Sequence, residues 1–123
     1  MNPRTATTGL VLPPPVDSDD RADIERSLAG DGEAYARLVR RHQASIASYL
    51  WRFTRDRGDW EELVQEVFVE AYLSLRSYRA RAPLAHWLRR IATRVGYRFW
   101  KKRARRRREA AMPFMAVWNS DPR

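Results

Sequence analysis

The clearest alternation of apolar and polar positions in the chain lies in residues 59–75. Apolar side chains recur there every three or four residues, as on one face of an amphipathic helix. They are Trp60, Leu63, Val64, Val67, Phe68, Ala71, Tyr72 and Leu75. Most other positions carry a carboxylate or an amide, and none carries Lys or Arg. The pattern predicts an acidic helix, with Asp59 as its cap and Glu62 completing a capping box.

Further helices are predicted on both sides of this one. Upstream, Ser18 can cap a short acidic helix, and Asp31 can cap a longer one that continues to about Arg55. The longer helix has an apolar face of Tyr35, Leu38, Val39, His42, Ile46, Leu50 and Phe53. Downstream, Pro83 can open a last helix, with Leu84, Trp87, Leu88, Ile91, Ala92, Val95 and Phe99 facing inward. No segment alternates with the period of two that strands show, so we expect an all-α fold, a compact three- to four-helix bundle.

The ends of the chain lack this periodicity. Residues 1–17 include three consecutive prolines, which favour an extended conformation over a helix. We therefore expect a disordered arm over residues 1–17, a helical domain over 18–108, and a linker or docking tail over 109–123. A length of 123 residues suits one domain with a modest core.

Charge is distributed unevenly along the chain. The formal net charge is +9, and residues 76–108 carry many Lys and Arg side chains but no acid. This balance favours a polyanionic partner, with nucleic acid preferred over a ribosome-like or membrane surface. The last helix is expected to present Arg90, Arg94, Arg98 and Lys101 on its outer face. The acidic helix is expected to face a basic protein partner.

Several kinds of chemistry find no support in the sequence. The chain has no Cys, which excludes disulfides and thiolate sites and suits a reducing cytosol. No apolar run approaches the roughly 20 residues of a membrane span. His42 and His86 fall on predicted apolar faces, where packed histidines are commoner than ligands or bases. Neither a glycine-rich phosphate loop nor a metal-ligand spacing occurs, so we predict no catalytic residue, metal or cofactor, and no enzyme.

Three segments together resemble a known family. Residues 59–68 are similar to the D-x-E-D-L-x-Q-E-x-F type motif of region 2 in extracytoplasmic-function (ECF) sigma factors of the sigma-70 family. Residues 31–42 resemble that family's opening helix, and residues 87–92 match its W-L-x-x-I-A signature, followed by a basic run. The resemblance covers about residues 20–108. It implies a sigma region 2 type of helical bundle.

The resemblance also implies partners and sites. Contacts to the clamp helices of the largest subunit of core RNA polymerase would come from Asp59, Glu62, Gln65 and Glu66. A loop over residues 77–82 and the last helix would recognise the promoter −10 element as a single non-template strand and support its melting. The base-capturing loop would hold Tyr78, Arg79 and Arg81. The phosphates of the non-template strand would be bound by Arg90, Arg94, Arg98, Lys101 and Lys102.

Individual residues leave alternatives open. Tyr78 can stack on a base, which is worth about 1–3 kcal/mol, or can only close the core; Trp87 is expected in the core. Arg94 and Arg98 replace an Asn and an acid that are common in the family, so phosphate binding is kept while the base preference stays open.

The role of the whole protein also leaves alternatives. No second promoter-reading domain follows Arg108, which favours a domain fragment over a protein that uses one such domain. An anti-sigma protein is expected as a further partner, and the cytoplasm as the location. The alternatives are a regulatory module held mainly by that anti-sigma protein, or a non-specific basic nucleic-acid-binding protein.

Overall fold

The chain is a bundle of helices. The computed structural model describes the backbone of residues 17–119 and the side chains of residues 17–113. Over that part it contains α2 (Ser18–Leu28), α3 (Gly32–Leu50), α4 (Arg57–Leu73), the short 3-10 helix η1 (Leu75–Ser77) and α5 (Leu84–Asn119), and no strand. The predicted all-α bundle is therefore confirmed. The predicted N-terminal arm, except Asp17, lies outside the described residues.

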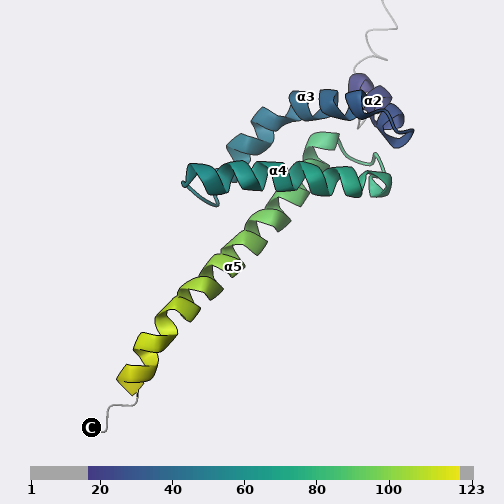
Figure 1. Cartoon of the computed structure of the whole chain (residues 1–123). Helices are drawn as coiled ribbons and strands as arrows, with labels where there is room; N and C mark the ends of the chain where they lie inside the picture. Colours follow the sequence, from purple (N-terminus) through teal and green to yellow (C-terminus); the bar gives the residue numbers. More distant parts are fainter. Residues whose placement is uncertain (1–16, 120–123) are drawn as a thin grey trace, which may run out of the picture.

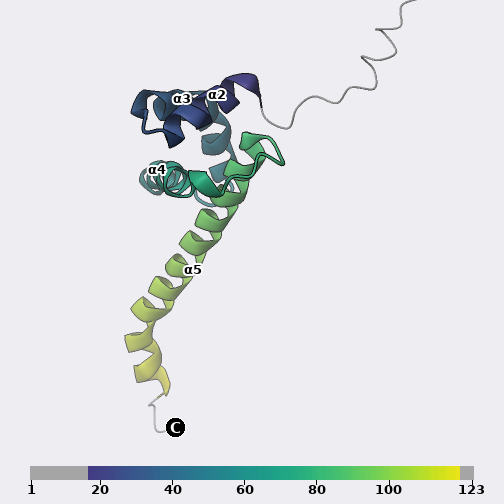
Figure 2. The same ribbon diagram turned by 90° about the vertical axis from the view of Figure 1, so that its right-hand side faces the viewer.

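The helices α3, α4 and the first half of α5 pack on one another, and α2 lies against α3 (Figure 1). In the perpendicular view, α5 passes beneath α3 and α4 and then leaves the bundle as a long arm (Figure 2). Its backbone stays helical through Pro113 to Asn119, so no break separates the predicted tail from the basic run. The domain boundary at residue 108 stays a prediction. None of the helices in the described part of the chain has the length and apolar character needed to cross a membrane.

The core lies where α3, α4 and α5 meet. Its buried members are mainly the predicted inward positions: Leu38, Ile46, Leu50, Phe53, Leu63, Val67, Phe68, Ala71, Leu75, Leu84, Leu88, Ile91, Ala92 and Val95. Trp60, Val64, Trp87 and Phe99 are partly buried at its edge. Tyr72 was predicted to face inward, but it is 53% exposed, because α4 is covered on only one side.

Two helices begin earlier than predicted. Asp17, rather than Ser18, caps α2, since its carboxylate accepts the backbone N–H of Asp19 at 2.8 Å. Asp56, rather than Asp59, caps α4 and accepts the N–H of Asp59 at 2.8 Å. In each case the upstream carboxylate satisfies an N–H that the first turn leaves without a partner. The prediction that Asp31 caps α3 is confirmed.

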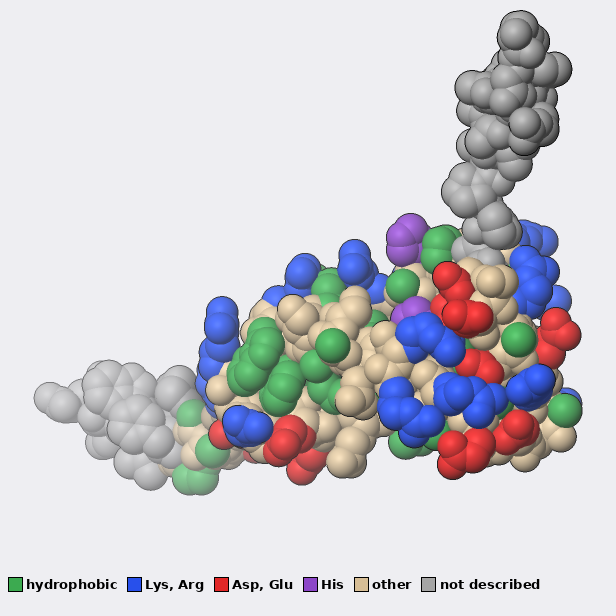
Figure 3. Space-filling model, turned by 90° about the horizontal axis from the view of Figure 1, so that it is seen from above, with side chains coloured by type: hydrophobic (Ala, Val, Ile, Leu, Met, Phe, Trp, Pro, Cys, Tyr) green, Lys and Arg blue, Asp and Glu red, His purple; other side chains and the backbone are tan. Residues whose placement is uncertain are grey.

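A buried ionic cluster joins α2 to α3. Asp23 accepts hydrogen bonds from Arg37 at 2.9 and 3.0 Å and from Arg41 at 2.9 Å. Asp20 contacts Arg41 at 2.5 Å and the Nε2 atom of His42 at 2.8 Å. Seen from above, acidic and basic side chains also alternate on the surface over one end of the molecule (Figure 3). Hydrogen bonds from Arg37, and then from Arg41, lower the pKa of the Asp23 carboxyl below its ordinary value.

The helix α3 is shorter than predicted. It ends at Leu50 instead of near Arg55, and three turn residues follow before Thr54. Phe53 returns to the core and lies against Gly96 of α5, where an added Cβ would stand 2.5 Å from the phenyl ring. The absence of a side chain at Gly96 therefore allows the segment after α3 to cross α5 closely.

Candidate functional site

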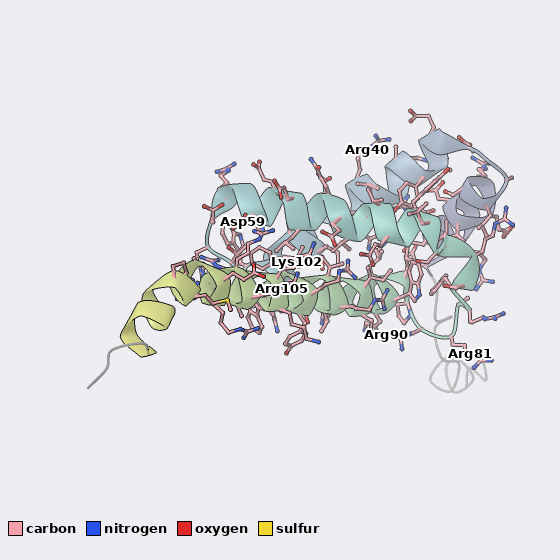
Figure 4. All side chains as sticks on the ribbon, turned by 60° about the horizontal axis from the view of Figure 1, so that its bottom comes forward. Arg40, Asp59, Arg81, Arg90, Lys102 and Arg105 are labelled. Atoms are coloured by element: carbon pink, nitrogen blue, oxygen red, sulfur yellow. The ribbon has the colours of Figure 1, made fainter. Side chains whose placement is uncertain are left out.

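One open groove lies between the loop after η1 and the first turns of α5. Its volume is about 790 Å³. Its lining includes Tyr78, Arg79, Arg81 and Arg90, four of the eight residues predicted to bind DNA. Figure 4 shows Arg81 and Arg90 together at this end of the molecule. We call this cavity the loop groove.

The loop that borders the groove is held by its own contacts. The Tyr78 hydroxyl donates a hydrogen bond to the carbonyl oxygen of Ala82, and the Tyr78 ring lies 5.3 Å from the Trp87 ring. Ala80 adopts a φ of 57°, which is unusual for a residue with a side chain and turns the backbone between the two exposed arginines. Burial raises the pKa of Tyr78, so its hydroxyl remains a donor at neutral pH. Tyr78 thus closes the edge of the core and lines the groove at once.

Four more residues of the loop groove were not predicted as site residues. They are His86, Trp87, Arg89 and Thr93. His86 was expected on an apolar face, but it is exposed at the groove, because α5 leaves this side uncovered by another helix. Arg89 and Thr93 follow His86 at steps of three and four residues, which is the sequence signal for a shared helix face.

The chemistry of the loop groove suits an anionic strand. Arg79, Arg81, Arg89 and Arg90 line it, and no carboxylate does. Within the described part of the chain, none of these arginines takes part in an ion pair. Guanidinium groups bind phosphate oxygens, while aromatic rings such as Trp87 offer stacking surfaces for bases.

A second groove, with mixed charge, lies between α4 and α5. It has a volume of about 110 Å³ and is lined by Asp59, Glu62 and Glu66 of α4 and by Arg98, Lys102 and Arg106 of α5. Figure 4 shows Asp59 and Lys102 facing each other across it. Three of the four residues predicted to bind polymerase are therefore together.

The arginines of α5 occupy part of the acidic face. Arg98 contacts Glu66 at 2.5 Å and also pairs with Glu70, and Arg94 lies 3.8 Å from Glu70. Both were predicted on the outer face of the last helix, and both are exposed, but their guanidinium groups lie beside carboxylates of α4. The two carboxylates raise the pKa of Arg98 through hydrogen bonds, first from Glu66 and then from Glu70.

Two acidic side chains keep their charge available. Asp59 and Glu62 form no ion pair within the described part of the chain, and Glu62 is exposed. The acidic face is thus partly neutralised at its centre by Arg98 and remains open towards the start of α4. Lys101 is exposed on α5 and does not line this groove.

The fourth predicted polymerase contact, Gln65, lies in a different place. It borders an apolar groove of about 460 Å³ between α3 and α4, with Val39, Val64 and Tyr72 among its neighbours. The exposed side chains of Val69 and Leu73 continue this apolar surface along α4. The outer surface of α4 is therefore acidic near its start and apolar near its end. The sequence pattern did not predict the apolar part.

Known proteins match most of the chain. The sequence profile of the family described as Sigma-70 region 2 matches residues 38–106. The ECF RNA polymerase sigma-E factor of Haemophilus influenzae is 37% identical over 87 residues, which are 71% of this chain and 46% of that protein. The sigma-E factor of Escherichia coli K12 is 36% identical, over 71% of this chain and 45% of that protein.

A solved structure agrees with these sequence matches. The NMR structure of an engineered region 2 of sigmaE in complex with GTAAAA has a TM-score of 0.66 and 34% identity, covering 71% of this chain and 90% of that chain. The chain spans less than half the length of the sigma-E factors that it matches. The profile covers more than half of the chain, and the residues that line the loop groove and the mixed-charge groove between α4 and α5 lie within the match. The resemblance predicted from three motifs is thus confirmed, and the chain belongs to the Sigma-70 region 2 family.

Proposed function

We propose that this chain acts as the region 2 domain of an ECF sigma factor, binding core RNA polymerase through α4 and the melted −10 element of a promoter through the loop groove. The observation that carries the proposal is the separation of two surfaces of opposite charge. The loop groove has four arginines and no carboxylate in its lining. The start of α4 keeps Asp59 and Glu62 without an internal ion pair among the described residues.

The DNA part of the proposal assigns a role to each side of the loop groove. Arg79, Arg81 and Arg90 bind phosphates, and Tyr78 and Trp87 supply the aromatic wall for a flipped base. Arg94, Arg98, Lys101 and Lys102 stay predictions for further phosphate contacts. The support for Arg98 is weaker than for the loop arginines, because its guanidinium already has two carboxylate partners.

Binding of short single strands tests this part directly. A labelled GTAAAA strand, the sequence in the sigmaE complex, and a strand of the same composition in scrambled order are titrated against the 123-residue chain. We expect the first strand to bind more tightly. Equal affinity for the two strands, with the steep salt dependence of simple charge neutralisation, would instead support the alternative of a non-specific basic nucleic-acid-binding protein.

The polymerase part of the proposal rests on Asp59 and Glu62, with Gln65 and the apolar surface beyond it as the continuation. Charged groups at the rim of an interface steer association, and apolar groups such as Tyr72 and Leu73 supply the buried area. The basic clamp helices of the largest polymerase subunit are the proposed partner. Glu66, paired with Arg98, would have to exchange its partner in the complex.

Capture of core polymerase by the immobilised chain tests this part. Glu62→Lys is expected to abolish capture, while Glu61→Lys on the same helix serves as the matched control, since Glu61 lines neither groove. Undiminished capture by Glu62→Lys would rule out this face.

An anti-sigma protein held on the apolar groove is the second candidate; a stable complex with such a protein that excludes polymerase would favour it. A sigma factor is not an enzyme, and we place this one in the cytoplasm.

A further inference from the structure

A third groove lies on the side of α5 that faces away from α4. Its volume is about 670 Å³, and it is formed by the segment after α3 and the distal part of α5. The lining includes four arginines and two tryptophans, and no carboxylate: Arg52, Arg55, Arg103, Arg107, Trp51 and Trp100. None of the four guanidinium groups has an ion-pair partner among residues that the structure describes. We call this cavity the tryptophan groove.

The aromatic walls of the tryptophan groove are fixed by the fold. The Nε1 atom of Trp100 donates a hydrogen bond to the carbonyl oxygen of Phe53 at 2.8 Å. Trp51 stacks on Trp60, with ring centres 4.5 Å apart and ring planes inclined by 13°. Trp60 is held in turn by a hydrogen bond to the carbonyl oxygen of Ala47 at 2.7 Å. These rings need no ordering when a ligand arrives, which lowers the entropic cost of binding.

The tryptophan groove continues the loop groove along one face of α5. Arg89, in the loop groove, is followed by Trp100, Arg103 and Arg107 at steps of 11, 3 and 4 residues, which keep to one side of a helix. Between the grooves, the Tyr49 ring contacts the guanidinium groups of both Arg89, at 5.4 Å, and Arg52, at 4.0 Å. A row of positive charge therefore joins the two cavities.

The two sides of α5 differ in how their charge is used. Arg98, Lys102 and Arg106 face the carboxylates of α4, whereas Arg103 and Arg107 face a cavity without any acid. On the face seen from above, basic side chains border a hydrophobic patch towards the end where α5 leaves the bundle (Figure 3). Among the described residues, the basic side chains of the first side therefore lie beside carboxylates, and those of the second side do not.

We propose that the tryptophan groove binds the phosphate backbone of the nucleic acid that flanks the segment held in the loop groove. The inference rests on the proposed function, because the position of the strand in the loop groove decides where its flanking phosphates lie. From Arg89 to Arg103 the helix rises about 21 Å, which matches about six base-pair steps of duplex DNA. Continuity with the loop groove favours nucleic acid over an acidic peptide, and the exposed Trp100 offers a stacking surface for an unpaired base.

The test compares strands of different length on the 123-residue chain. The probes are labelled GTAAAA alone and the same six nucleotides extended by eight thymidines at the 5′ or the 3′ end, each extension single-stranded or paired with a complement. Arg103→Ala/Arg107→Ala removes two charges from the groove. Arg105→Ala/Arg108→Ala removes two charges from the same turns of α5, outside every groove lining, and is the matched control.

The extension at one end is expected to strengthen binding to the unchanged protein. If the extension is single-stranded, the Arg103→Ala/Arg107→Ala variant is expected to lose roughly 25-fold in affinity for that probe at 0.1 M salt, with a salt slope reduced by about 1.4. If the extension is paired, the expected loss is roughly 60-fold and the slope falls by about 1.8. Its affinity for the bare six nucleotides should change much less, because Arg103 lies about 21 Å, or two Debye lengths, along the helix from Arg89 in the loop groove. The control variant should lose clearly less on the long probe.

Two results would overturn the inference. One is an extension that does not strengthen binding at either end of the six nucleotides. The other is an equal loss of affinity in both double variants, because such a loss would reflect the overall positive charge of α5 and no specific binding in the tryptophan groove. Failure of the loop groove gives a different result: the six nucleotides alone do not bind, while the long probe still depends on Arg103 and Arg107.

Discussion

The packing of this fold is most sensitive to an added methyl group at Gly96. Gly96→Ala places a Cβ 2.5 Å from Cδ2 and Cε2 of Phe53, well inside van der Waals contact. Phe53 is 5% exposed, and its ring is bordered by the rings of Tyr49, Tyr97 and Trp100, so it cannot swing aside. Overpacking of this kind costs about 1–3 kcal/mol.

The helix propensity of alanine acts in the opposite direction, by about 1 kcal/mol. A 2.5 Å approach to a ring that is held on several sides puts the cost in the upper part of the overpacking range, about 2–3 kcal/mol. We therefore expect Gly96→Ala to lower the free energy of unfolding by about 1–2 kcal/mol. For a domain of this size the corresponding fall in melting temperature is about 5–15 °C, measured by thermal unfolding followed by circular dichroism.

Two further variants make the Gly96 prediction specific. Gly32→Ala adds the same methyl group at the start of α3, where nothing lies within 4 Å of the new Cβ, and should leave stability unchanged or slightly higher. Phe53→Leu combined with Gly96→Ala should recover part of the loss, because a smaller side chain vacates the contact. A Gly96→Ala protein that melts at or above the temperature of the unchanged protein would refute the packing described here.

The remaining predictions concern single polar groups. Arg98→Ala leaves two α4 carboxylates to repel each other. The free energy of unfolding at low salt should fall by about 0.5–1 kcal/mol, and the difference should shrink at high salt. An equal loss at both salt concentrations would count against the pairing. Asp23→Asn should destabilise the protein at neutral pH and make its stability less dependent on pH in acid. The pKa of Asp23 is lowered from 3.8 in the folded protein. The stabilisation by its carboxylate is therefore present above pH 3.8 and is lost as the pH falls through the lowered folded-state pKa. Urea titrations from pH 5 to 2.5 measure this, and parallel curves for the two proteins would contradict it. Tyr78→Phe removes the hydrogen bond to Ala82, so tryptic cleavage within the loop should become about fivefold faster; unchanged cleavage would show that the bond does not hold the loop.

The local sequence patterns of this chain predict where its helices lie, but they do not predict how the helices pack against one another. The apolar spacing in α4 identifies Leu63, Val67, Phe68 and Ala71 as core residues, because a helix that buries one face must repeat every three to four positions. The same spacing placed Tyr72 inside, since a stripe does not reveal how far the covering helices extend. Capping was ambiguous wherever two Asp or Ser residues stood close together, as at Asp56 and Asp59.

The candidate site shows the same limit. The sequence contains Arg94 and Arg98 at helical spacing, but their alignment with Glu70 and Glu66 depends on how α5 is rotated against α4, which no local pattern specifies. The ionic cluster of α2 and α3, and the approach of Phe53 to Gly96, are also contacts between distant parts of the chain. The family resemblance did point to Tyr78, Arg79 and Arg81, which line the loop groove and are neighbours in the sequence.

We propose that protein binding and nucleic-acid binding use separate surfaces of this small bundle. The most direct test measures both ligands on two variants: affinity for core polymerase and affinity for GTAAAA, with Glu62→Lys and with Arg79→Ala/Arg81→Ala. We expect Glu62→Lys to lose polymerase and keep the oligonucleotide, and the arginine variant to lose roughly 20-fold in oligonucleotide affinity at 0.1 M salt while still binding polymerase. A variant that loses both ligands together, while its circular dichroism spectrum stays that of the folded protein, would contradict the separation.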